Sequence, residues 1–509
     1  TNFMLPDGEF DQAKYDDAVK KWEEFYGKSQ TFVVATPEQL LQVDMAFAEW
    51  GKVLNVKFQR VDGDIAQIRI GSGDISPVKS ASGGVAAAYE YRPEKGNTGN
   101  PLTDINAIVM GTTGSGQTAD WSPGTQQFEA LLHEIGHALG LDHPGDYATG
   151  IPAGAEDNRA DTLMSYLSPN YPDAFRQSVD GYGSIVMTPG KPASTPAKYD
   201  IAALQTKLGV NTASKTDDVY TFVESYSASD VTRRTIYDAG GTDWFNASQQ
   251  IFNVQINLEP GAASSLGTAS REKDQWRNVA IAFDTIIENA IGGSGNDILF
   301  GNKYDNRLLG GRGNDTLYGG GGGEDTLEGG DDYDTYLVKS GEGTVHIKDT
   351  GANRIEFINA DGKKEILKGL FIRDKSNPSK YLLQEEGSKK TRALEFHSPG
   401  RLTLDDTTTL VFDEQTSAEG FKNHDFHLFL YDNAPGATAR EIVGNLLPED
   451  FDAGATGIQA HFDDLNNPIL TASPDIGRMD LLNDGASNDH LAGGKGNDTL
   501  LALAGGNDT

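Results

Sequence analysis

Apolar side chains near the start of the chain recur at helical spacing. Thr36, Pro37 and Gln39 stand as a capping residue, a proline at the first helical position and a polar residue at the third, which together mark a helix start. The apolar positions that follow are Leu40, Val43, Phe47 and Trp50. Their spacing of three and four residues predicts an amphipathic helix that buries one face.

A second helical pattern covers residues 126–139, where the apolar side chains again share one face: Phe128, Leu131, Leu132, Ile135 and Leu139. Between the two helices, β-branched and polar residues alternate at 56–61 and 65–70, and a third extended segment covers 85–91. These segments predict a twisted sheet backed by helices. We therefore expect residues 1–210 to form an α/β domain.

The second predicted helix carries a histidine pattern that suits metal chemistry. His133 and His137 are four residues apart and so lie on nearly one helix face, at the spacing that two imidazoles need to hold one ion, with Glu134 beside them. Gly140 can adopt a left-handed conformation that ends the helix and lets His143 return as a third ligand. Three neutral imidazoles leave one position for a water, whose pKa falls to about 7 on zinc and whose proton Glu134 can take. The pattern HExxHxxGxxH thus predicts a catalytic zinc ion.

Composition and charge limit the kinds of molecule and ion that the chain is expected to bind. The chain has 75 acidic and 42 basic residues among 509, a net charge of -33, which disfavours nucleic acid and favours divalent cations such as calcium. It has no cysteine, so disulfides and thiolate ligands are excluded. No stretch approaches the ~18 apolar residues of a membrane span, and the amino end lacks the pattern of a signal peptide. We expect a soluble chain with no transmembrane segment.

From residue 292 the sequence repeats every nine residues. The copies are GGSGNDILF (292–300), GNKYDNRLL (301–309), GGRGNDTLY (310–318), GGGGGEDTLE (319–328) and GGDDYDTYL (329–337). They follow the calcium-binding nonapeptide GGxGxDxUx, in which U is a large apolar residue. The glycines permit a tight turn and expose carbonyl oxygens, and the sixth-position Asp adds a carboxylate, so each turn offers the oxygen ligands that calcium prefers.

Residues 341–475 follow this first repeat block and alternate apolar and polar residues, as at 344–347, 354–358 and 409–412. We expect a β-rich insertion there, whose role the pattern leaves open. Two further nonapeptides cover 484–492 and 493–501, and a partial copy breaks off at Thr509. We expect the natural chain to continue beyond it.

Several segments resemble one family. HEIGHALGLDHPG (133–145), followed by LMSY (163–166), is similar to the metzincin zinc peptidases and specifically to the serralysins. YDIAALQTKLGVN (199–211), IYDAGGTDWFNAS (236–248) and IIENAIGGSGND (286–297) are also similar to that family. The resemblance implies a zinc endopeptidase in which Met164 forms a turn beneath the zinc. It also implies that Tyr166 is a further, displaceable zinc ligand whose hydroxyl stabilises the oxyanion of the transition state.

The strand VAAAYEYRP (85–93) resembles the family's edge strand over the cleft. The resemblance implies that Ala86, Ala88 and Tyr89 bind an extended substrate through backbone hydrogen bonds. Backbone pairing does not read a peptide's sequence, so we expect broad cleavage of protein or peptide substrates. An ordinary sheet strand is the alternative reading of this segment.

The resemblance also implies several calcium ions beside the one zinc ion. The implied calcium positions are Ser214, Thr216, Asp218, Asp238, Gly240, Gly241, Asp243, Glu288, Gly293, Gly295, Asp297, Gly311, Gly313, Asp315, Asp325, Asp334 and Asp498. Asn306 replaces the sixth-position Asp of the degenerate copy and is expected to weaken its site. Without calcium the carboxylates repel one another, so we expect calcium binding to be coupled to folding of a parallel β-roll.

The expected organisation is multidomain. It comprises an α/β metzincin catalytic domain at 1–210, a parallel β-roll at 211–340, the β-rich insertion at 341–475 and a second, incomplete repeat block at 476–509. We expect a monomer that is secreted to the extracellular medium through a type I secretion system. Two other functions stay open: a calcium-dependent adhesin that binds a bacterial cell-surface component, and a self-processing protease that acts mainly on itself or on another surface RTX protein.

Overall fold

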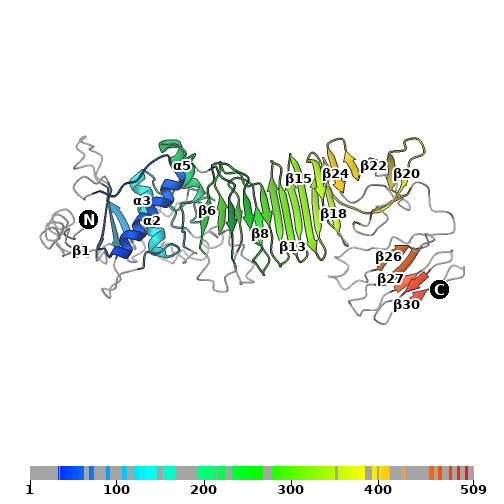
Figure 1. Ribbon diagram of the computed structural model, residues 1–509, viewed down its shortest axis with the longest axis horizontal. Coiled ribbons are helices and arrows are strands. Elements are labelled where there is room, and N and C mark those ends of the chain that lie inside the picture. The colour runs from blue at the N-terminus through cyan, green and yellow to red at the C-terminus, as the bar shows by residue number, and fades with distance from the viewer. Residues whose placement is uncertain are drawn as a thin grey trace. The chain divides into compact units, whose positions relative to one another are not determined.

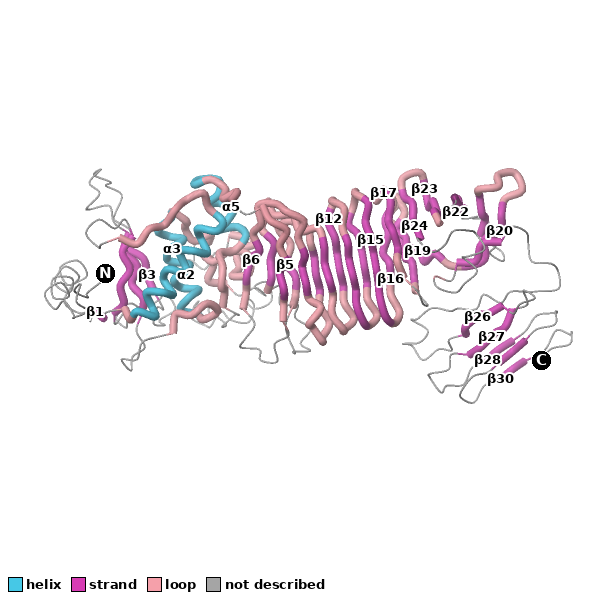
Figure 2. The backbone as a smooth tube through the Cα atoms, viewed as in Figure 1, coloured by secondary structure: helices cyan, strands magenta, loops and turns pink. Residues whose placement is uncertain are grey.

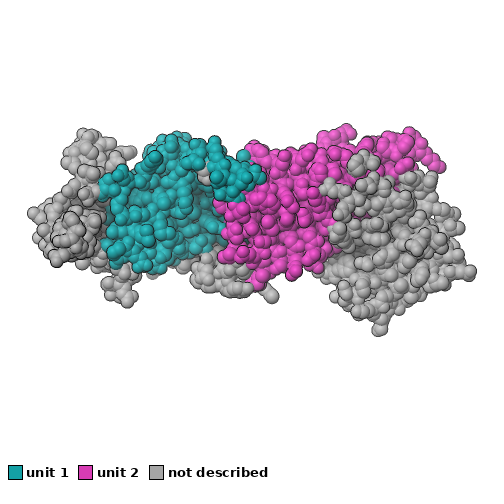
Figure 3. All heavy atoms as spheres, viewed as in Figure 1, with its two compact units in different colours: residues 1–218, 224–242, 260–286 teal, residues 219–223, 243–259, 287–509 magenta. Residues whose placement is uncertain are grey.

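The computed structural model divides the chain into two compact units. Unit 1 comprises residues 1–218, 224–242 and 260–286, and unit 2 comprises 219–223, 243–259 and 287–509 (Figure 3). The structure describes residues 32–33, 35–61, 68–73, 88–91, 106–111, 120–145, 153–154, 156–167, 192–213, 215–223, 232–266, 278–349, 353–383, 393–397, 400–412, 426, 428–431, 458–462, 468–472, 481–483, 490–492 and 499–501. Within these residues, no helix has both the length and the apolar character of a membrane span.

Unit 1 contains a four-stranded sheet. Its strands lie in the order β1 (Phe32–Val33), β2 (Ile68–Gly73), β4 (Asn106–Gly111) and β3 (Ala88–Tyr91). The central strands β2 and β4 are parallel, whereas β1 and β3 run antiparallel to their neighbours. Strand β3 lies at one end of this sheet, opposite β1. One edge of β3 therefore pairs with no other strand of this four-stranded sheet.

Both predicted helices of unit 1 are confirmed. Helix α2 (Pro37–Val53) begins at the Thr36 capping box, and α3 (Gln126–Leu139) covers the predicted residues (Figure 1). The Trp50 indole donates to the carbonyl oxygen of Leu132 over 3.3 Å and so joins the two helices. A third helix, α5 (Lys198–Leu208), and a small sheet in the order β6 (Arg234–Ile236), β10 (Val279–Ile281) and β9 (Ala263–Ser264) complete the described elements of unit 1.

The prediction of a strand at residues 56–61 is wrong. The Phe58 ring packs against Phe47 of α2 with ring centroids 5.0 Å apart, and Arg60 donates to the carbonyl oxygen of Leu40 over 2.7 Å. The alternating side chains thus attach this segment to a helix instead of to a sheet. The other two predicted strands correspond to β2 and β3, with residues 65–67 and 85–87 outside the described residues.

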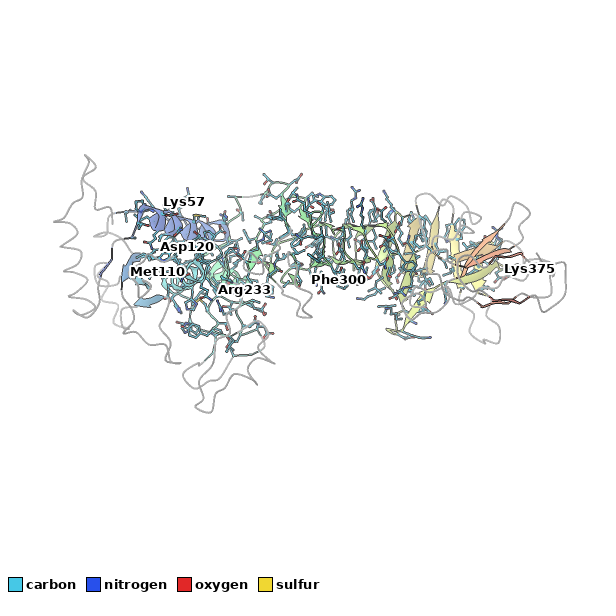
Figure 4. All side chains as sticks on the ribbon, turned by 90° about the horizontal axis from the view of Figure 1, so that it is seen from below. Lys57, Met110, Asp120, Arg233, Phe300 and Lys375 are labelled. Carbon is cyan, nitrogen blue, oxygen red and sulfur yellow. The ribbon has the colours of Figure 1, made fainter. Side chains whose placement is uncertain are left out.

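A buried ion network ties α3 to the chain around it. One carboxylate oxygen of Glu129 accepts from Arg159 Nη2 at 2.8 Å and from Arg233 Nη2 at 2.6 Å, while the other accepts from the Ala193 backbone at 2.8 Å. Figure 4 labels Arg233. Burial raises the pKa of Glu129, but the two guanidinium groups outweigh it and lower that pKa below its usual value. Glu129 is therefore an ionised anchor one helical turn before His133.

Unit 2 is built largely of two sheets of parallel strands (Figure 2). The first contains β5 (Val219–Thr221), β7 (Trp244–Asn246), β11 (Asn289–Ile291), β13 (Arg307–Arg312), β15 (Glu324–Asp331), β17 (Gly343–Ile347) and β24 (Thr408–Phe412). The second contains β8 (Gln255–Asn257), β12 (Ile298–Asn302), β14 (Thr316–Gly320), β16 (Thr335–Lys339) and β18 (Arg354–Ile358). Successive strands alternate between the sheets through the repeat region, as a parallel roll requires.

The apolar residue of each nonapeptide points into this roll. The corresponding side chains are all fully buried: Leu299, Leu308, Leu317, Leu327 and Tyr336. The side chain that follows each of these, such as Phe300 on β12 (Figure 4), is only partly buried or exposed. The nine-residue period therefore places one large apolar side chain per half-turn in a single core.

The parallel pairing continues past the last nonapeptide. Strands β17 and β18 pair with β15 and β16, so the expected boundary between 340 and 341 falls inside the roll's sheets. Antiparallel strands then extend both sheets: β19 (Lys364–Leu367) on one, and β23 (Arg401–Asp405), β22 (Ala393–His397), β21 (Lys380–Leu383) and β20 (Gly369–Arg373) on the other, where β25 (Leu428–Tyr431) pairs in parallel with β20. The strand predictions at 344–347, 354–358 and 409–412 are confirmed.

Short strands also form in the second repeat block and just before it. Strand β27 (Pro468–Ala472) pairs antiparallel with β26 (Ile458–Phe462) and parallel with β29 (His490–Ala492). Strand β28 (Leu481–Asn483) pairs in parallel with β30 (Thr499–Leu501). Two nonapeptides of this block therefore end in parallel strands, like those of the first block.

Candidate active site and metal centres

Three histidine nitrogens converge at the end of helix α3. The Nε2 atom of His143 lies 3.2 Å from Nε2 of His133 and 3.1 Å from Nε2 of His137. The convergence depends on Gly140, which ends the helix with φ of 105° and accordingly turns the chain back. The predicted left-handed glycine and the return of His143 are both confirmed.

The Nδ1 atoms of His133 and His137 show that the Nε2 atoms of these two residues present lone pairs. His133 Nδ1 lies 2.7 Å from the Leu163 carbonyl oxygen, and His137 Nδ1 lies 2.9 Å from that of Leu141. Because a carbonyl only accepts, both Nδ1 atoms carry the hydrogen and both Nε2 atoms are unprotonated. Burial, and then the neighbouring His137, lower the pKa of His133 well below its usual value. The His133 imidazole is therefore in the neutral form that binds metal.

The separations fit zinc. Zinc–nitrogen bonds of about 2.0–2.1 Å in a tetrahedral arrangement put neighbouring nitrogen ligands about 3.3–3.4 Å apart. Unprotonated nitrogens at 3.1–3.2 Å repel one another unless a cation or a shared hydrogen lies between them, and His143 can supply only one hydrogen. His133, His137 and His143 thus form a donor set that a zinc ion satisfies.

A turn that follows the helix in the chain holds the His133 ring in place through its Nδ1 atom. The carbonyl that holds its Nδ1 belongs to Leu163, whose backbone N–H donates to Asp200 Oδ2 over 2.7 Å. The Thr162 hydroxyl donates to the other oxygen of Asp200 over 2.5 Å. Asp200 is fully buried at the start of α5, and burial raises its pKa to about 6. Asp200 therefore orients the turn that orients His133.

Met164 lies in this turn and is buried. A side chain added at Gly136 of α3 would begin 3.1 Å from the Met164 sulfur and 3.4 Å from Trp50. The turn and the helix consequently meet at a point where only glycine fits without displacing a neighbour. This contact places Met164 against helix α3, and its role beneath a zinc ion stays a prediction.

Glu134 and Tyr166 complete the group of residues around the imidazoles. Glu134 follows His133 on α3 and is buried. The Tyr166 ring stacks on His133 with centroids 5.7 Å apart and lies 4.6 Å from the ring of His143. Burial, and then the Glu134 carboxylate, raise the pKa of Tyr166 to about 12, so the phenol keeps its proton at neutral pH. The structure therefore brings all five predicted residues of the zinc site together.

Carboxylates of the nonapeptides form a ladder along the roll. The backbone N–H of Asp297 donates to Asp315 Oδ1 at 2.7 Å, and that of Asp315 donates to Asp334 Oδ1 at 2.8 Å. At the other edge of the roll, the Asn306 N–H donates to Asp325 Oδ1 at 2.9 Å. The second carboxylate oxygens of Asp315, Asp325 and Asp334 are buried and accept no hydrogen bond among the described residues. A buried carboxylate oxygen of this kind calls for a cation.

The glycines of each turn make room for these carboxylates. A Cβ atom at Gly310 would clash with Asp315 Oδ2 of its own turn. At Gly311, φ is 120° and a side chain would clash with the carbonyl oxygen of Gly293 in the preceding turn. Carbonyl and carboxylate oxygens thus line the space between successive turns, and these residues fit calcium.

Burial changes the acidity of the carboxyl groups in this ladder. Burial raises the pKa of Asp297 to about 6, of Asp315 to about 8, and of Asp325 and Asp334 to about 7. Neighbouring carboxylates add to this shift for Asp315, Asp325 and Asp334. Calcium would reverse it because a divalent cation favours the ionised form.

The implied calcium positions ahead of the repeats have distinct surroundings. In unit 1, Asp218 accepts from the Thr216 hydroxyl over 3.1 Å, and Asp238 accepts from the Gly240 N–H over 2.7 Å. In unit 2, Glu288 accepts from the Asp243 N–H over 2.7 Å. Gly241 follows Gly240 with φ of 154°. Their roles as calcium ligands stay predictions.

Some predicted residues lie outside the described residues. These are Ala86, Ser214 and Asp498. Ala88 and Tyr89 lie in the edge strand β3, where the structure describes the backbone. Their role in substrate binding stays a prediction.

Comparisons with known proteins match three separate regions of the chain to family models. Residues 24–149 match the family model for matrixin, and residues 197–368 match the model for the peptidase M10 serralysin C-terminal region. Residues 477–509 match the RTX calcium-binding nonapeptide repeat. The helical region with the histidine triad and the region with parallel sheets therefore each correspond to a separate family model.

Curated relatives agree with these matches. Serralysin G of Dickeya chrysanthemi is 33% identical over 296 residues, which cover 54% of this chain and 56% of the relative. Serralysin C of the same organism is 36% identical over 289 residues, covering 53% and 54%. Serralysin of Proteus mirabilis is 33% identical over 319 residues, covering 57% and 59%. The matched part thus spans less than two thirds of each of these relatives.

These findings define the class first: a zinc-binding histidine triad of the metzincin pattern on an α/β unit. More particularly, the chain is similar to serralysin-type M10 metalloproteases, because its regions match the models for matrixin, for the serralysin C-terminal region and for the RTX calcium-binding repeat. The triad and the repeats imply zinc and calcium as the metals.

Sequence reasoning missed three residues that position this site: Glu129, Gly136 and Asp200. Glu129 precedes His133 by four residues on the same helix face, so its carboxylate at an otherwise apolar position was a possible signal. Asp200 occurs in a segment that resembles the serralysins. Its hydrogen-bond donors are Thr162 and Leu163, which come 38 and 37 positions earlier in the chain, so no local pattern in the sequence indicates these bonds.

Replacing Asp200 by Ala should weaken zinc binding. The Leu163 N–H and the Thr162 hydroxyl would lose their acceptor, and the turn would hold the His133 ring less firmly. Loss of such a supporting group typically costs 10- to 100-fold in metal affinity, and we expect about tenfold weaker binding in competition with a chromogenic zinc chelator. Asp44→Ala, on the exposed face of α2, is the control. Unchanged zinc affinity in a folded Asp200→Ala variant would contradict the role given to Asp200.

Without calcium, the roll should lose stability as the pH rises. A carboxyl whose pKa is raised by folding gives a stabilisation that is complete below its unfolded pKa of about 4 and is lost as the pH passes its folded pKa. The folded values lie between about 6 for Asp297 and about 8 for Asp315. In a calcium chelator, the unfolding temperature followed by circular dichroism should therefore fall between pH about 5 and about 9.

Saturating calcium should remove or reverse this dependence, because the ionised carboxylates bind the ion. The matched measurement repeats the pH series in excess calcium. An unfolding temperature in chelator that rises over the same range would show that these carboxyls are not buried in the calcium-free fold.

Proposed function

We propose that the chain is a zinc-dependent endopeptidase that hydrolyses peptide bonds of extended protein substrates. The observation that carries this proposal is the convergence of three imidazoles, in which His143 Nε2 lies 3.2 Å from His133 Nε2 and 3.1 Å from His137 Nε2, beside Glu134 and Tyr166. The matrixin match and the serralysin relatives support the same activity. A zinc ion with a purely structural role would not need the Glu134 carboxylate and the Tyr166 phenol beside it.

His133, His137 and His143 would hold the zinc ion, which as a Lewis acid polarises a peptide carbonyl and lowers the pKa of water. Glu134 is placed next to the triad by its position on α3, directly after His133. Its carboxylate acts as the general base that accepts the proton of the attacking water and passes it to the leaving amine.

Tyr166 supplies a hydrogen-bond donor to the oxyanion that develops on the peptide carbonyl. Its pKa of about 12 keeps the phenol protonated at neutral pH, as this role requires. Its ring lies against His133 and His143, so the hydroxyl belongs to the same site. A phenol that is 36% exposed is also accessible to substrate. Tyr166 serves in addition as a displaceable zinc ligand.

The substrate binds as an extra strand beside β3. This strand ends the four-stranded sheet and runs antiparallel to β4, so one row of its backbone groups lies outside the ladder. Strand addition binds peptides through main-chain hydrogen bonds and tolerates many sequences. Ala86, Ala88 and Tyr89 stay the proposed substrate-binding residues. The enzyme therefore cleaves peptides of many different sequences.

Calcium bound in the roll stabilises the exported enzyme. The buried carboxylates of Asp315, Asp325 and Asp334 support this part of the proposal. Low calcium before export disfavours folding of the roll, and high calcium outside favours it. Secretion to the extracellular medium by a type I route is consistent with this coupling.

Replacing Glu134 by Gln should abolish peptide hydrolysis while the fold and the zinc remain. Loss of a general base typically lowers kcat by about 10²- to 10⁴-fold. Hydrolysis of a denatured protein, zinc content by mass spectrometry and far-ultraviolet circular dichroism measure the three quantities. Glu38→Gln, on the exposed first turn of α2, should retain full activity. Undiminished cleavage by the Glu134→Gln variant would exclude the proposed mechanism.

Replacing Tyr166 by Phe should lower kcat by about 10²-fold and leave KM nearly unchanged, because the lost hydrogen bond forms mainly in the transition state. Steady-state kinetics on a fluorogenic peptide separate the two constants. Tyr199→Phe, which alters another partly exposed phenol of unit 1, is the control. If KM rises while kcat holds, Tyr166 serves in substrate binding instead.

A further inference from the structure

Two hydroxyl groups in the turn after α3 make the same pair of hydrogen bonds. The first is that of Thr162, which accepts from the Met164 N–H over 3.1 Å and donates to Asp200 over 2.5 Å. Asp200 also accepts from the Leu163 N–H, and the Leu163 carbonyl accepts from His133 Nδ1. The Thr162 hydroxyl therefore belongs to the contacts that position a predicted zinc ligand.

The Ser165 hydroxyl repeats this pattern further along the turn. It accepts from the Leu167 N–H over 3.0 Å and donates to Asp157 Oδ1 over 2.7 Å. Both Ser165 and Asp157 are only 2% exposed. A hydroxyl that accepts from the N–H two residues later fixes the backbone between the two residues. The residue between Ser165 and Leu167 is Tyr166.

The partners of these two groups are themselves fixed. Asp157 Oδ2 accepts from the Ala153 N–H over 3.0 Å, so each oxygen of this buried carboxylate has a donor. The Leu167 carbonyl accepts from the Arg159 N–H over 2.9 Å, which closes the turn into a loop. The backbone on each side of Tyr166 is therefore held by hydrogen bonds to an earlier part of the same segment.

The Tyr166 side chain differs from its two neighbours in burial. Ser165 and Leu167 are 2% and 3% exposed, whereas Tyr166 is 36% exposed. Its ring centroid lies 5.7 Å from that of His133 and 4.6 Å from that of His143. A partly exposed side chain is less confined by packing than a buried one, so its position depends more on the backbone that carries it. The place of the phenol beside the imidazoles therefore depends on the two hydrogen-bonded neighbours.

We propose that Asp157 and Ser165 are positioning residues for Tyr166: they hold its backbone and thereby keep the phenol where it can donate to the oxyanion. This inference rests on the proposed function, in which Tyr166 is that donor. The turn then has two separate supports. Thr162 and Asp200 position a predicted metal ligand, and Ser165 and Asp157 position the phenol. A displacement of about 1 Å in a reacting group can cost about 10²-fold in rate, so such a support affects catalysis.

Replacing Ser165 by Ala in the full chain is the first test. We expect kcat to fall between about 10- and 10²-fold with KM nearly unchanged, because a misplaced phenol stabilises the transition state less. The loss should not exceed that of Tyr166→Phe, in which the donor itself is absent. Zinc affinity, measured against a chromogenic chelator, should stay unchanged, because His133 is held by the other support. Thr206→Ala, which removes an exposed hydroxyl from α5, is the control.

The second test combines Ser165→Ala with Tyr166→Phe. If Ser165 acts through the phenol, kcat of the double variant should equal that of Tyr166→Phe alone. Losses that multiply would show that Ser165 supports the site in another way, and they would overturn the proposal. Hydrogen exchange followed by mass spectrometry gives a measurement independent of activity. A peptide that covers residues 163–167 should exchange faster in Ser165→Ala, because the Leu167 N–H has lost its acceptor.

Two outcomes separate this inference from the proposed function. A Tyr166→Phe variant with full kcat would overturn both the catalytic role of the phenol and this inference. A lowered kcat in Tyr166→Phe, together with an unchanged kcat in Ser165→Ala, would overturn this inference alone. If Ser165→Ala does not fold, Ser165→Cys replaces it, because a thiol is only a weak donor and acceptor. Its kcat should lie between those of the unaltered chain and Tyr166→Phe, and a kcat equal to that of the unaltered chain would exclude the positioning role.

Discussion

The fold packs electron-rich groups close to one another, and this constraint governs both units. In unit 1, the Nε2 atom of His143 lies 3.1–3.2 Å from those of His133 and His137. In unit 2, carboxylate oxygens of Asp315, Asp325 and Asp334 are buried without donors among the described residues. Each arrangement is unfavourable by itself and favourable around a cation. The metals therefore belong to the energetics of the fold as much as to its chemistry.

The two units enforce this proximity by different means. Around the triad, side chains distant in sequence cooperate: Asp200 holds Leu163, Leu163 holds His133, and the ionised Glu129 fixes helix α3. Along the roll, the same local turn is stacked repeatedly, and each aspartate accepts from the backbone of the preceding turn. A unique tertiary network suits one precise catalytic geometry, whereas a repeated ladder suits several similar ions.

Local signals in the sequence predicted much of this. The capping box at Thr36, the limits of α3 and the turn at Gly140 follow from interactions within a few residues. The nonapeptides likewise fix their own turns and buried apolar residues. The strand predicted at 56–61 was wrong because alternation of side chains cannot tell whether the opposing surface is a sheet or, as here for Phe58, a helix.

The sequence by itself determined the histidine triad, the acid beside it and the repeated turns, because each depends on spacing along a helix or on a nine-residue period. Only the tertiary structure decided which distant residues support them. Asp200 accepts hydrogen bonds from Thr162 and Leu163, which come 38 and 37 positions earlier in the chain, and Glu129 accepts from Arg233, which comes 104 positions later. The physical reason is that burial and approach of charges depend on the whole packed chain, which local spacing does not specify.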